Sequence, residues 1–241
     1  MPTQNLEDIR ARVSNIVGSF PVFTGENSVG DDTIDEGIDQ ARKIFSKIKP
    51  HIIVEDEVGD DGRYYALGML ADWQDDFSEI LSIDWDAASR ISSDEQVNPL
   101  NRDDGDWTYY RDATTRYLVF PNHSPASSLT FRVTYTTFQT LSATTSTVPL
   151  QYEEAIIYLA VSRLARIVQW RVEKATDPPG GAQFVTMRNK SSGFDRLAEV
   201  YFDLYIAEMG GDGVVAASAV REFDQRFMLG DHYIFHSGRQ R

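Results

Sequence analysis

The chain has 241 residues and no cysteine, so it is long enough for one moderate domain or two small ones, and disulfides and thiolate chemistry are excluded. Hydrophobic residues make up 41% of it, which argues against intrinsic disorder, and no apolar run approaches the roughly 20 residues of a membrane-spanning helix. The net charge of −14 comes from residues 1–110, which carry 24 Asp and Glu against 9 Lys and Arg. This acidic half is either an ordinary solvated surface or one that keeps DNA from sticking, because it repels phosphates.

Two amphipathic helices are predicted in the first 50 residues, and the acidic start of the chain favours no export signal. Apolar residues recur at helical spacing over residues 5–17, and Gly18 is a plausible end. A second helix is expected from Thr33, which would form a capping box with Glu36, as far as Pro50.

A small antiparallel β region is expected next, because the hydrophobic period changes from helical to alternating. Residues 129–136 alternate between apolar and polar side chains, and residues 79–85 alternate through Leu81, Ile83 and Trp85. The stretches "HIIVE" and "RYLVF" are further strand candidates. The acidic runs at residues 55–61 and 103–106 lack the register of a calcium loop and are interpreted as solvated turns.

The helical period returns over residues 151–175, where apolar residues extend around most of the helix, so it must be covered on more than one side. After the break "DPPGG", residues 187–210 are expected to form its hairpin partner. The side chains expected to pack inward include Ile157, Val161, Leu164, Val168, Tyr201 and Tyr205.

The predicted fold class is α+β. It consists of a helical bundle, made of two N-terminal helices and a long C-terminal helical hairpin, with an inserted small antiparallel β region and an extended C-terminal arm. The corresponding segments are residues 1–50, 51–150, 151–210 and 211–241.

Motifs for catalysis and metal binding are missing from the sequence. No nucleophile elbow, phosphate-binding loop or dinucleotide-binding motif occurs. The one histidine pair with ligand-like spacing is His232 and His236, and only Asp231 or Asp224 is near enough in sequence to add a ligand. We therefore expect no enzyme, no metal and no cofactor.

Three local patterns stand in a characteristic order: "FRVTYTTFQTL" at residues 131–141, "TVPLQYEEAIIYLAVSRLARI" at residues 147–167 and "RNKSSGFDRLAEVYFDLYIAEMG" at residues 188–210. Together with two N-terminal helices and a β insertion, they resemble the head-tail connector, or adaptor, proteins of tailed bacteriophages. The resemblance covers residues 5–210, and residues 115–210 carry most of it.

This resemblance implies a structural virion protein of the neck, assembled in the host cytoplasm. About twelve copies would form a homo-oligomeric ring, a dodecamer, that docks on the portal protein and extends the DNA channel used in DNA ejection. The ring would receive the tail or a stopper protein, and it would enclose DNA without sequence-specific binding and without a membrane. The inward residues of the two C-terminal helices would then pack the subunit core or the contact between ring neighbours.

The resemblance also favours an arm that reaches a neighbouring subunit or the portal, although the arm could instead fold back on its own subunit. Its aromatic side chains would be anchors in partner pockets, and its arginines would pair with acids on the partner. The residues assigned to this arm are Arg221, Phe223, Arg226, Phe227, Tyr233, Phe235, Arg239 and Arg241.

Two alternatives remain open at the level of sequence. One is another neck or tail structural protein, such as a stopper or tail terminator. The other is an unrelated binding module that uses the aromatic residues of the β region, such as Trp73, Trp85 and Trp107.

Overall fold

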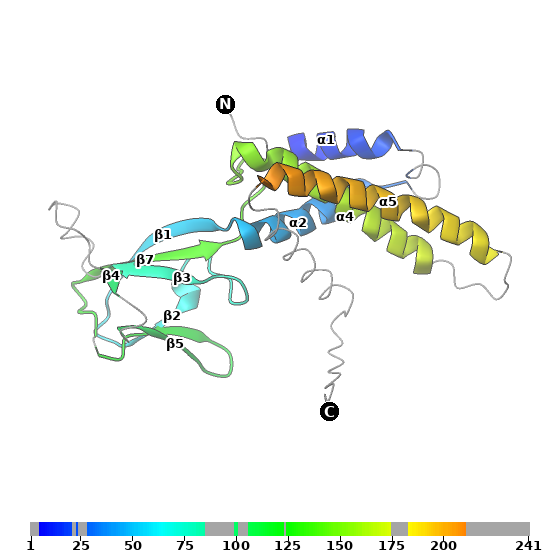
Figure 1. Ribbon diagram of the computed structural model, residues 1–241. Helices are drawn as coiled ribbons and strands as arrows, with labels where there is room; N and C mark the ends of the chain where they lie inside the picture. Colours follow the sequence, from blue (N-terminus) through cyan, green and yellow to red (C-terminus); the bar gives the residue numbers. More distant parts are fainter. Residues whose placement is uncertain are drawn as a thin grey trace. The chain divides into compact units, whose positions relative to one another are not determined.

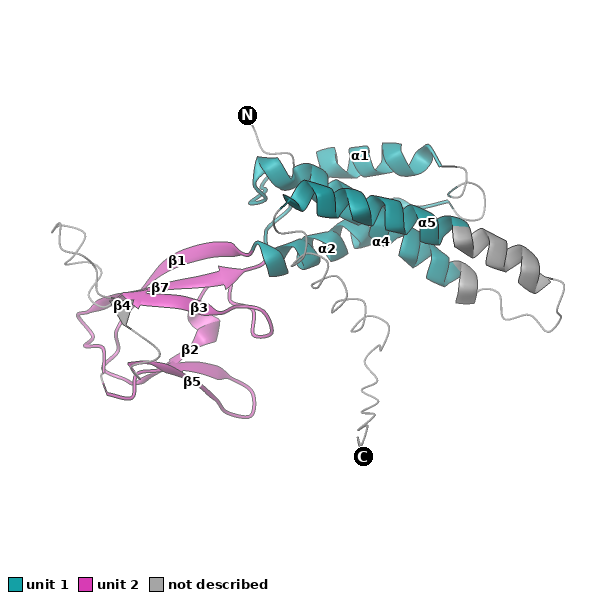
Figure 2. Ribbon diagram, in the orientation of Figure 1, with its two compact units in different colours: residues 1–49, 139–241 teal, residues 50–138 magenta. Residues whose placement is uncertain are grey.

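The computed structural model describes residues 5–20, 23, 28–84, 99–100, 106–122, 124–174 and 183–210. The chain divides into two compact units, which Figure 2 shows in different colours. The helical unit comprises residues 1–49 and 139–241, and the β unit comprises residues 50–138. In the sequence, therefore, the β unit interrupts the helical unit.

The described part of the helical unit contains the α-helices α1 (Leu6–Gly18), α2 (Asp31–Ile48), α4 (Glu153–Lys174) and α5 (Gln183–Met209), with a short 3-10 turn (Leu150–Tyr152) before α4. Within the described ranges, no helix combines the length and the apolar character needed to cross a membrane.

The starts of the first two helices differ in their chemistry. At α1, the Asn5 side chain accepts a hydrogen bond from the Asp8 N–H, and the Asp8 carboxylate accepts one from the Asn5 N–H, which is a capping box. At α2, the predicted capping box of Thr33 and Glu36 is wrong. The helix begins two residues earlier, after Gly30, and has no side-chain cap. Two acidic residues in its first turn stabilise it instead, because their negative charge interacts favourably with the positive end of the helix dipole.

The chain is α+β, but the predicted long C-terminal helical hairpin is not what the structure shows. Helix α4 is the centre of the helical unit, because α1, α2 and α5 all pack against it (Figure 1). The physical reason is that α4 is apolar around most of its circumference, so covering it requires three helices rather than one partner. Residues 175–182, between α4 and α5, and the predicted arm at residues 211–241 lie outside the described residues.

Helices α2 and α4 approach each other closely at Gly37. A Cβ atom placed on Gly37 would lie 2.6 Å from Cγ of Leu164 and 3.3 Å from the carbonyl oxygen of Ala160. Only glycine lets the two helix backbones come this close, so this residue sets the packing of α2 on the central helix.

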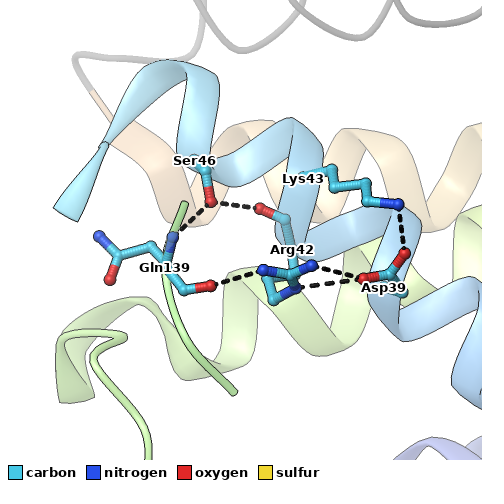
Figure 3. A network of polar contacts seen from close by, with 5 residues as sticks. All are labelled: Asp39, Arg42, Lys43, Ser46 and Gln139. Carbon is cyan, nitrogen blue, oxygen red and sulfur yellow. Dashed lines mark hydrogen bonds and ion pairs between the residues drawn. The ribbon is translucent and has the colours of Figure 1, made fainter. Parts of the chain in front are cut away.

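A polar network joins α2 to the segment that follows the β unit (Figure 3). The backbone N–H of Gln139 donates to the Ser46 hydroxyl over 2.9 Å, and this hydroxyl donates to the carbonyl oxygen of Arg42 over 2.7 Å. The Arg42 guanidinium donates to the carbonyl oxygen of Gln139 over 2.8 Å and to the Asp39 carboxylate over 2.6 Å. The returning chain is therefore fixed to α2 by backbone and side-chain bonds.

The described residues of the β unit form two antiparallel sheets. One is four-stranded, with the order β1-β7-β3-β4, and the other is three-stranded, with the order β2-β6-β5. The strands are β1 (His51–Val58), β2 (Tyr64–Ala66), β3 (Ile80–Asp84), β4 (Pro99–Leu100), β5 (Thr108–Arg111), β6 (Arg116–Val119) and β7 (Thr130–Thr137), and a 3-10 turn (Leu67–Met69) follows β2.

Residues of both sheets form the core of the β unit. Phe131, Val133 and Tyr135 of β7 are buried, which confirms the alternation predicted for this strand. The rings of Tyr65, Phe120 and Phe131 contact one another edge to face, with centroids 5.0 to 5.7 Å apart. The two sheets are thus held together by a shared aromatic cluster.

Two sequence expectations about these strands are wrong. Leu81 does not alternate inward with Ile83, because the pairing of β3 with β7 shifts between Ile80 and Ser82, which leaves Leu81 exposed and buries Ile80. The acidic residues 55–57 are not a turn, because they continue β1 and pair with β7. There Asp56 receives two hydrogen bonds from Arg132, directly across the ladder, over 2.6 and 2.8 Å.

Candidate interaction surface

The inward-facing residues predicted on the two C-terminal helices lie in the core of a single subunit. Tyr201 is partly buried and packs its ring against Phe20 and Tyr158. The fully or almost fully buried members of the set are Ile157, Val161, Leu164, Val168 and Tyr205. Because α1, α2 and α5 already cover these side chains, the apolar circumference of α4 does not require a neighbouring subunit.

The predicted arm residues, Arg221, Phe223, Arg226, Phe227, Tyr233, Phe235, Arg239 and Arg241, lie outside the described residues, as do His232 and His236. Among the residues that the structure describes, no group of three His, Asp or Glu side chains could hold a metal ion.

A groove of about 440 Å³ opens on the β unit. It lies between the segment that leads into β3 and the strands β5 and β6. Aromatic side chains and both signs of charge meet in it, and its lining consists of Trp73, Asp75, Asp76, Phe77, Ser78, Glu79, Tyr109, Tyr110, Arg111 and Arg116.

Contacts below and beside the groove hold its aromatic walls in place. The Trp73 indole N–H donates to the Asp75 carboxylate over 2.9 Å, and the rings of Phe77 and Phe138 stack with centroids 4.0 Å apart. The Tyr109 hydroxyl accepts a 2.8 Å hydrogen bond from the backbone N–H of Ile80. These rings therefore present fixed surfaces rather than freely rotating side chains.

Tyr135 packs against Trp73 and is a fixed hydrogen-bond donor. The centroids of the two rings lie 5.8 Å apart, and the Tyr135 hydroxyl donates to the Glu55 carboxylate over 3.0 Å. Burial raises the pKa of Tyr135 to about 12. The phenol therefore stays protonated near neutral pH and serves to position the wall of the groove.

A tyrosine cluster continues from the groove onto the three-stranded sheet, with Tyr64 and Tyr110 exposed and Tyr117 half-buried. Tyr64, Tyr110 and Tyr117 lie with ring centroids 6.1 to 6.4 Å apart, and Tyr110 directly faces Tyr117 in the ladder. Tyr110 belongs to both features, so groove and cluster form one aromatic surface. Tyrosine, tryptophan and arginine are the residues that contribute most often to the energy of protein interfaces.

The sequence pointed to only part of this surface. Of the three tryptophans proposed for a binding module, Trp73 lines the groove, Trp107 is buried in the core, and Trp85 lies outside the described residues. The tyrosine doublets at residues 64–65 and 109–110 were the missed signal. In a strand, one member of such a doublet faces the core and the other faces outward, as Tyr65 and Tyr64 do.

The helical unit has a smaller exposed apolar patch on α5. Val200 and Leu204, one helical turn apart, are 47% and 41% exposed. Both lie on the side of α5 away from Ala198 and Tyr205, which are buried in the core. This patch is available for contact with another protein.

Comparison with models of known protein families and with curated proteins gives no match.

Proposed function

We propose that the protein is a structural component of a phage neck, a head-tail connector that forms a ring on the portal protein and provides the attachment site for the tail. The observation that carries the proposal is the order of the parts. Helices α1 and α2 precede the β unit, and α4 and α5 follow it, with residues 50–138 inserted between the two halves. This is the order of elements in the family that the sequence resembles.

The charge distribution supports a conduit. Residues 1–110, which contain α1, α2 and the first strands of the β unit, carry 24 acidic against 9 basic residues. A basic wall would hold DNA by its phosphates, whereas an acidic subunit lets DNA pass. In this proposal the ring encloses DNA, contacts no base sequence and carries out no chemistry.

The exposed surfaces fit two different contacts in such a ring. The patch of Val200 and Leu204 suits a contact between neighbouring subunits, because a ring needs a heterologous interface that closes by rotation. The aromatic surface around Trp73 and Tyr110 suits the attachment of a second protein, either the tail or a stopper. The arm of residues 211–241 would reach the portal or a neighbouring subunit.

The proposal is tested by sedimentation of the full chain together with the portal protein encoded by the same genome. We expect co-sedimentation with many copies of the chain per portal. Leu204→Asp should abolish it, since the substitution places a charge in an apolar contact, and Asp203→Asn, on the exposed neighbouring residue of α5, should leave it unchanged. If the chain does not co-sediment with the portal, or if the two variants behave alike, the proposal fails.

The groove favours a second candidate function, a binding module unrelated to a phage neck. The aromatic side chains that line the groove are held in place by contacts within the β unit, so they could bind a partner whether or not the chain joins a ring. A module of this kind would bind its partner without forming a large ring, and it would not bind the portal protein. The co-sedimentation experiment therefore separates the two candidates.

A further inference from the structure

Among the strands that the structure describes, β1 is an edge of the four-stranded sheet. It is the first strand in the order β1-β7-β3-β4, it is eight residues long, and its pairing with β7 runs without a shift from His51 to Val58. Its exposed side chains include Ile52, Val54 and Val58, which are 54%, 55% and 60% exposed. Proteins usually protect such edges with charged side chains, above all lysine, with proline or with a bulge. The sequence "HIIVEDEV" has no lysine or proline and pairs with β7 without a bulge, and its charges are the three acidic residues 55–57.

The ladder determines which backbone groups of β1 face outward. The N–H of Gly59 donates to the carbonyl oxygen of Leu129 over 2.8 Å, and on the other side of β7 the N–H of Thr136 donates to the carbonyl oxygen of Glu79 over 2.9 Å. Because hydrogen-bonded pairs alternate along an antiparallel ladder, every second residue of β1 turns its N–H and C=O away from β7. These residues are Ile52, Val54, Asp56 and Val58.

We propose that β1 pairs with β1 of a second copy of the chain, antiparallel, with the two-fold axis at Val54. In this register Val54 faces Val54 and Ile52 faces Asp56, and the outward groups of these residues form about six backbone hydrogen bonds. On the other face of the sheet, Ile53 faces Glu55 and His51 faces Glu57. Like charges therefore do not oppose each other anywhere along the strand.

Registers with the axis in the second half of β1 are unfavourable because of the acidic residues there. An axis at Glu55 would place Glu55 against Glu55. An axis at Asp56 would place Asp56 against Asp56 and Glu55 against Glu57. Like charges directly opposite each other destabilise a ladder, so these two registers are excluded. An axis at Ile53 opposes no like charges, but within β1 it pairs only Ile52 with Val54 through outward groups, which gives about four backbone hydrogen bonds instead of six, so the longer ladder favours the axis at Val54.

This contact is isologous, since the same strand contributes from both copies, and it differs from the heterologous contact that closes a ring. It concerns the free protein before it meets any partner. The inference therefore does not depend on the proposed function, and either can fail without the other.

The first test is the mass of the full chain measured by sedimentation equilibrium over a range of concentrations. We expect twice the 27.2 kDa of one chain. Val54→Pro should give a folded monomer, because the N–H of residue 54 points outward and its loss leaves the pairing with β7 intact. Val54→Thr keeps both the N–H and a β-branched side chain and should remain a dimer. A wild-type chain that stays monomeric, or a Val54→Pro chain of unchanged mass, would overturn the proposal.

The second test uses charged side chains instead of proline to check that residue 54 of one copy faces residue 54 of the other. Val54→Lys and Val54→Glu should each weaken self-association at least tenfold, because residue 54 faces its own copy across the axis. An equimolar mixture of the two variants should form a heterodimer, since Lys then faces Glu. If the mixture is no more associated than either variant alone, the axis is not at Val54 and the proposal is wrong.

Discussion

The backbone N–H of Gln139 donates a hydrogen bond to the hydroxyl of Ser46, although the two residues are 93 positions apart in the sequence. Ser46 lies in the last turn of α2, and Gln139 is the first residue after the β unit. The bond therefore joins the two places where the chain leaves the helical unit and returns to it.

Replacing Ser46 by alanine should lower the free energy of unfolding by about 1–3 kcal/mol. The Gln139 N–H would lose its acceptor in a buried place, because Ser46 is 0% and Gln139 is 3% exposed. Urea denaturation measures the change. Ser19→Ala is the matched control, since the Ser19 hydroxyl is exposed and donates only to the nearby carbonyl oxygen of Ile16, and it should cost less than about 0.5 kcal/mol. Equal losses in the two variants would contradict the assigned role of Ser46.

Gly37→Val should destabilise the protein by about 1–3 kcal/mol, because the new side chain would overlap with Leu164, where α2 and α4 approach each other closely. Thermal unfolding followed by circular dichroism is the measurement. The control is Gly18→Ala, at the end of α1, where a Cβ atom would meet nothing within 4 Å. That variant should melt at the wild-type temperature or slightly above it, since alanine is the better helix former. A Gly37→Val protein as stable as wild type would show that α2 can move away from α4 without cost.

Asp39 should make stability depend on pH in acid. Burial by itself raises the pKa of Asp39, but hydrogen bonds from Lys43 and Arg42 outweigh it, so the pKa lies below its ordinary value. Stabilisation by this carboxylate is therefore present above the unfolded pKa of about 4 and is lost as the pH falls through the lower folded value.

Asp39→Asn should accordingly cost less than about 1 kcal/mol at pH 7, because the ion pairs are half-exposed. The difference from wild type should shrink as the pH drops below about 4. Melting temperatures from pH 7 to pH 2 check this, with Asp203→Asn as a control on an exposed carboxylate. A difference that stays constant or grows in acid would contradict the sign of the effect.

The isolated protein should bind duplex DNA negligibly at physiological salt. Its net charge is −14, and the acidic excess lies in residues 1–110. Specific or non-specific binding needs Lys and Arg to neutralise phosphates and then shows a steep dependence on salt. A gel-shift titration is the measurement. Micromolar binding that weakens steeply with added salt would contradict the conduit argument.

Removal of residues 214–241 should leave the melting temperature nearly unchanged and abolish attachment to the portal. The described core of the helical unit is formed by residues from Ile9 to Met209. Helix α5 ends at Met209, and the next residue, Gly210, has a φ of 57°, which is typical of the residue that follows a helix. Calorimetry and co-sedimentation with the portal measure the two effects. Loss of the fold, or full attachment without the segment, would each contradict the assignment of this segment as an attachment arm.

Sequence reasoning succeeded where the pattern depends on one local element. The helix predicted over residues 5–17 and the strand predicted over residues 129–136 are both present within one residue or so, because a continuous period marks each of them. The apolar circumference of α4 correctly indicated cover on several sides.

Features that depend on two distant segments could not be predicted. Which helices cover α4 is decided by tertiary packing and not by the sequence of α4 itself. For this reason a hairpin was inferred, whereas α1, α2 and α5 all pack against α4. The exposure of Leu81 follows from a shift in its pairing with β7, about fifty residues away, and no pattern within β3 encodes it. The groove brings Trp73 and Asp76 to Tyr110 and Arg116, and only the ladder between β5 and β6 and its packing on β3 make them neighbours.

The proposed ring on a portal can be seen directly by electron microscopy of negatively stained particles. The full chain would be mixed with the portal protein encoded by the same genome and imaged beside the portal alone. We expect an added ring of density, coaxial with the portal channel and built of about twelve copies. Portal particles identical with and without the chain would contradict it.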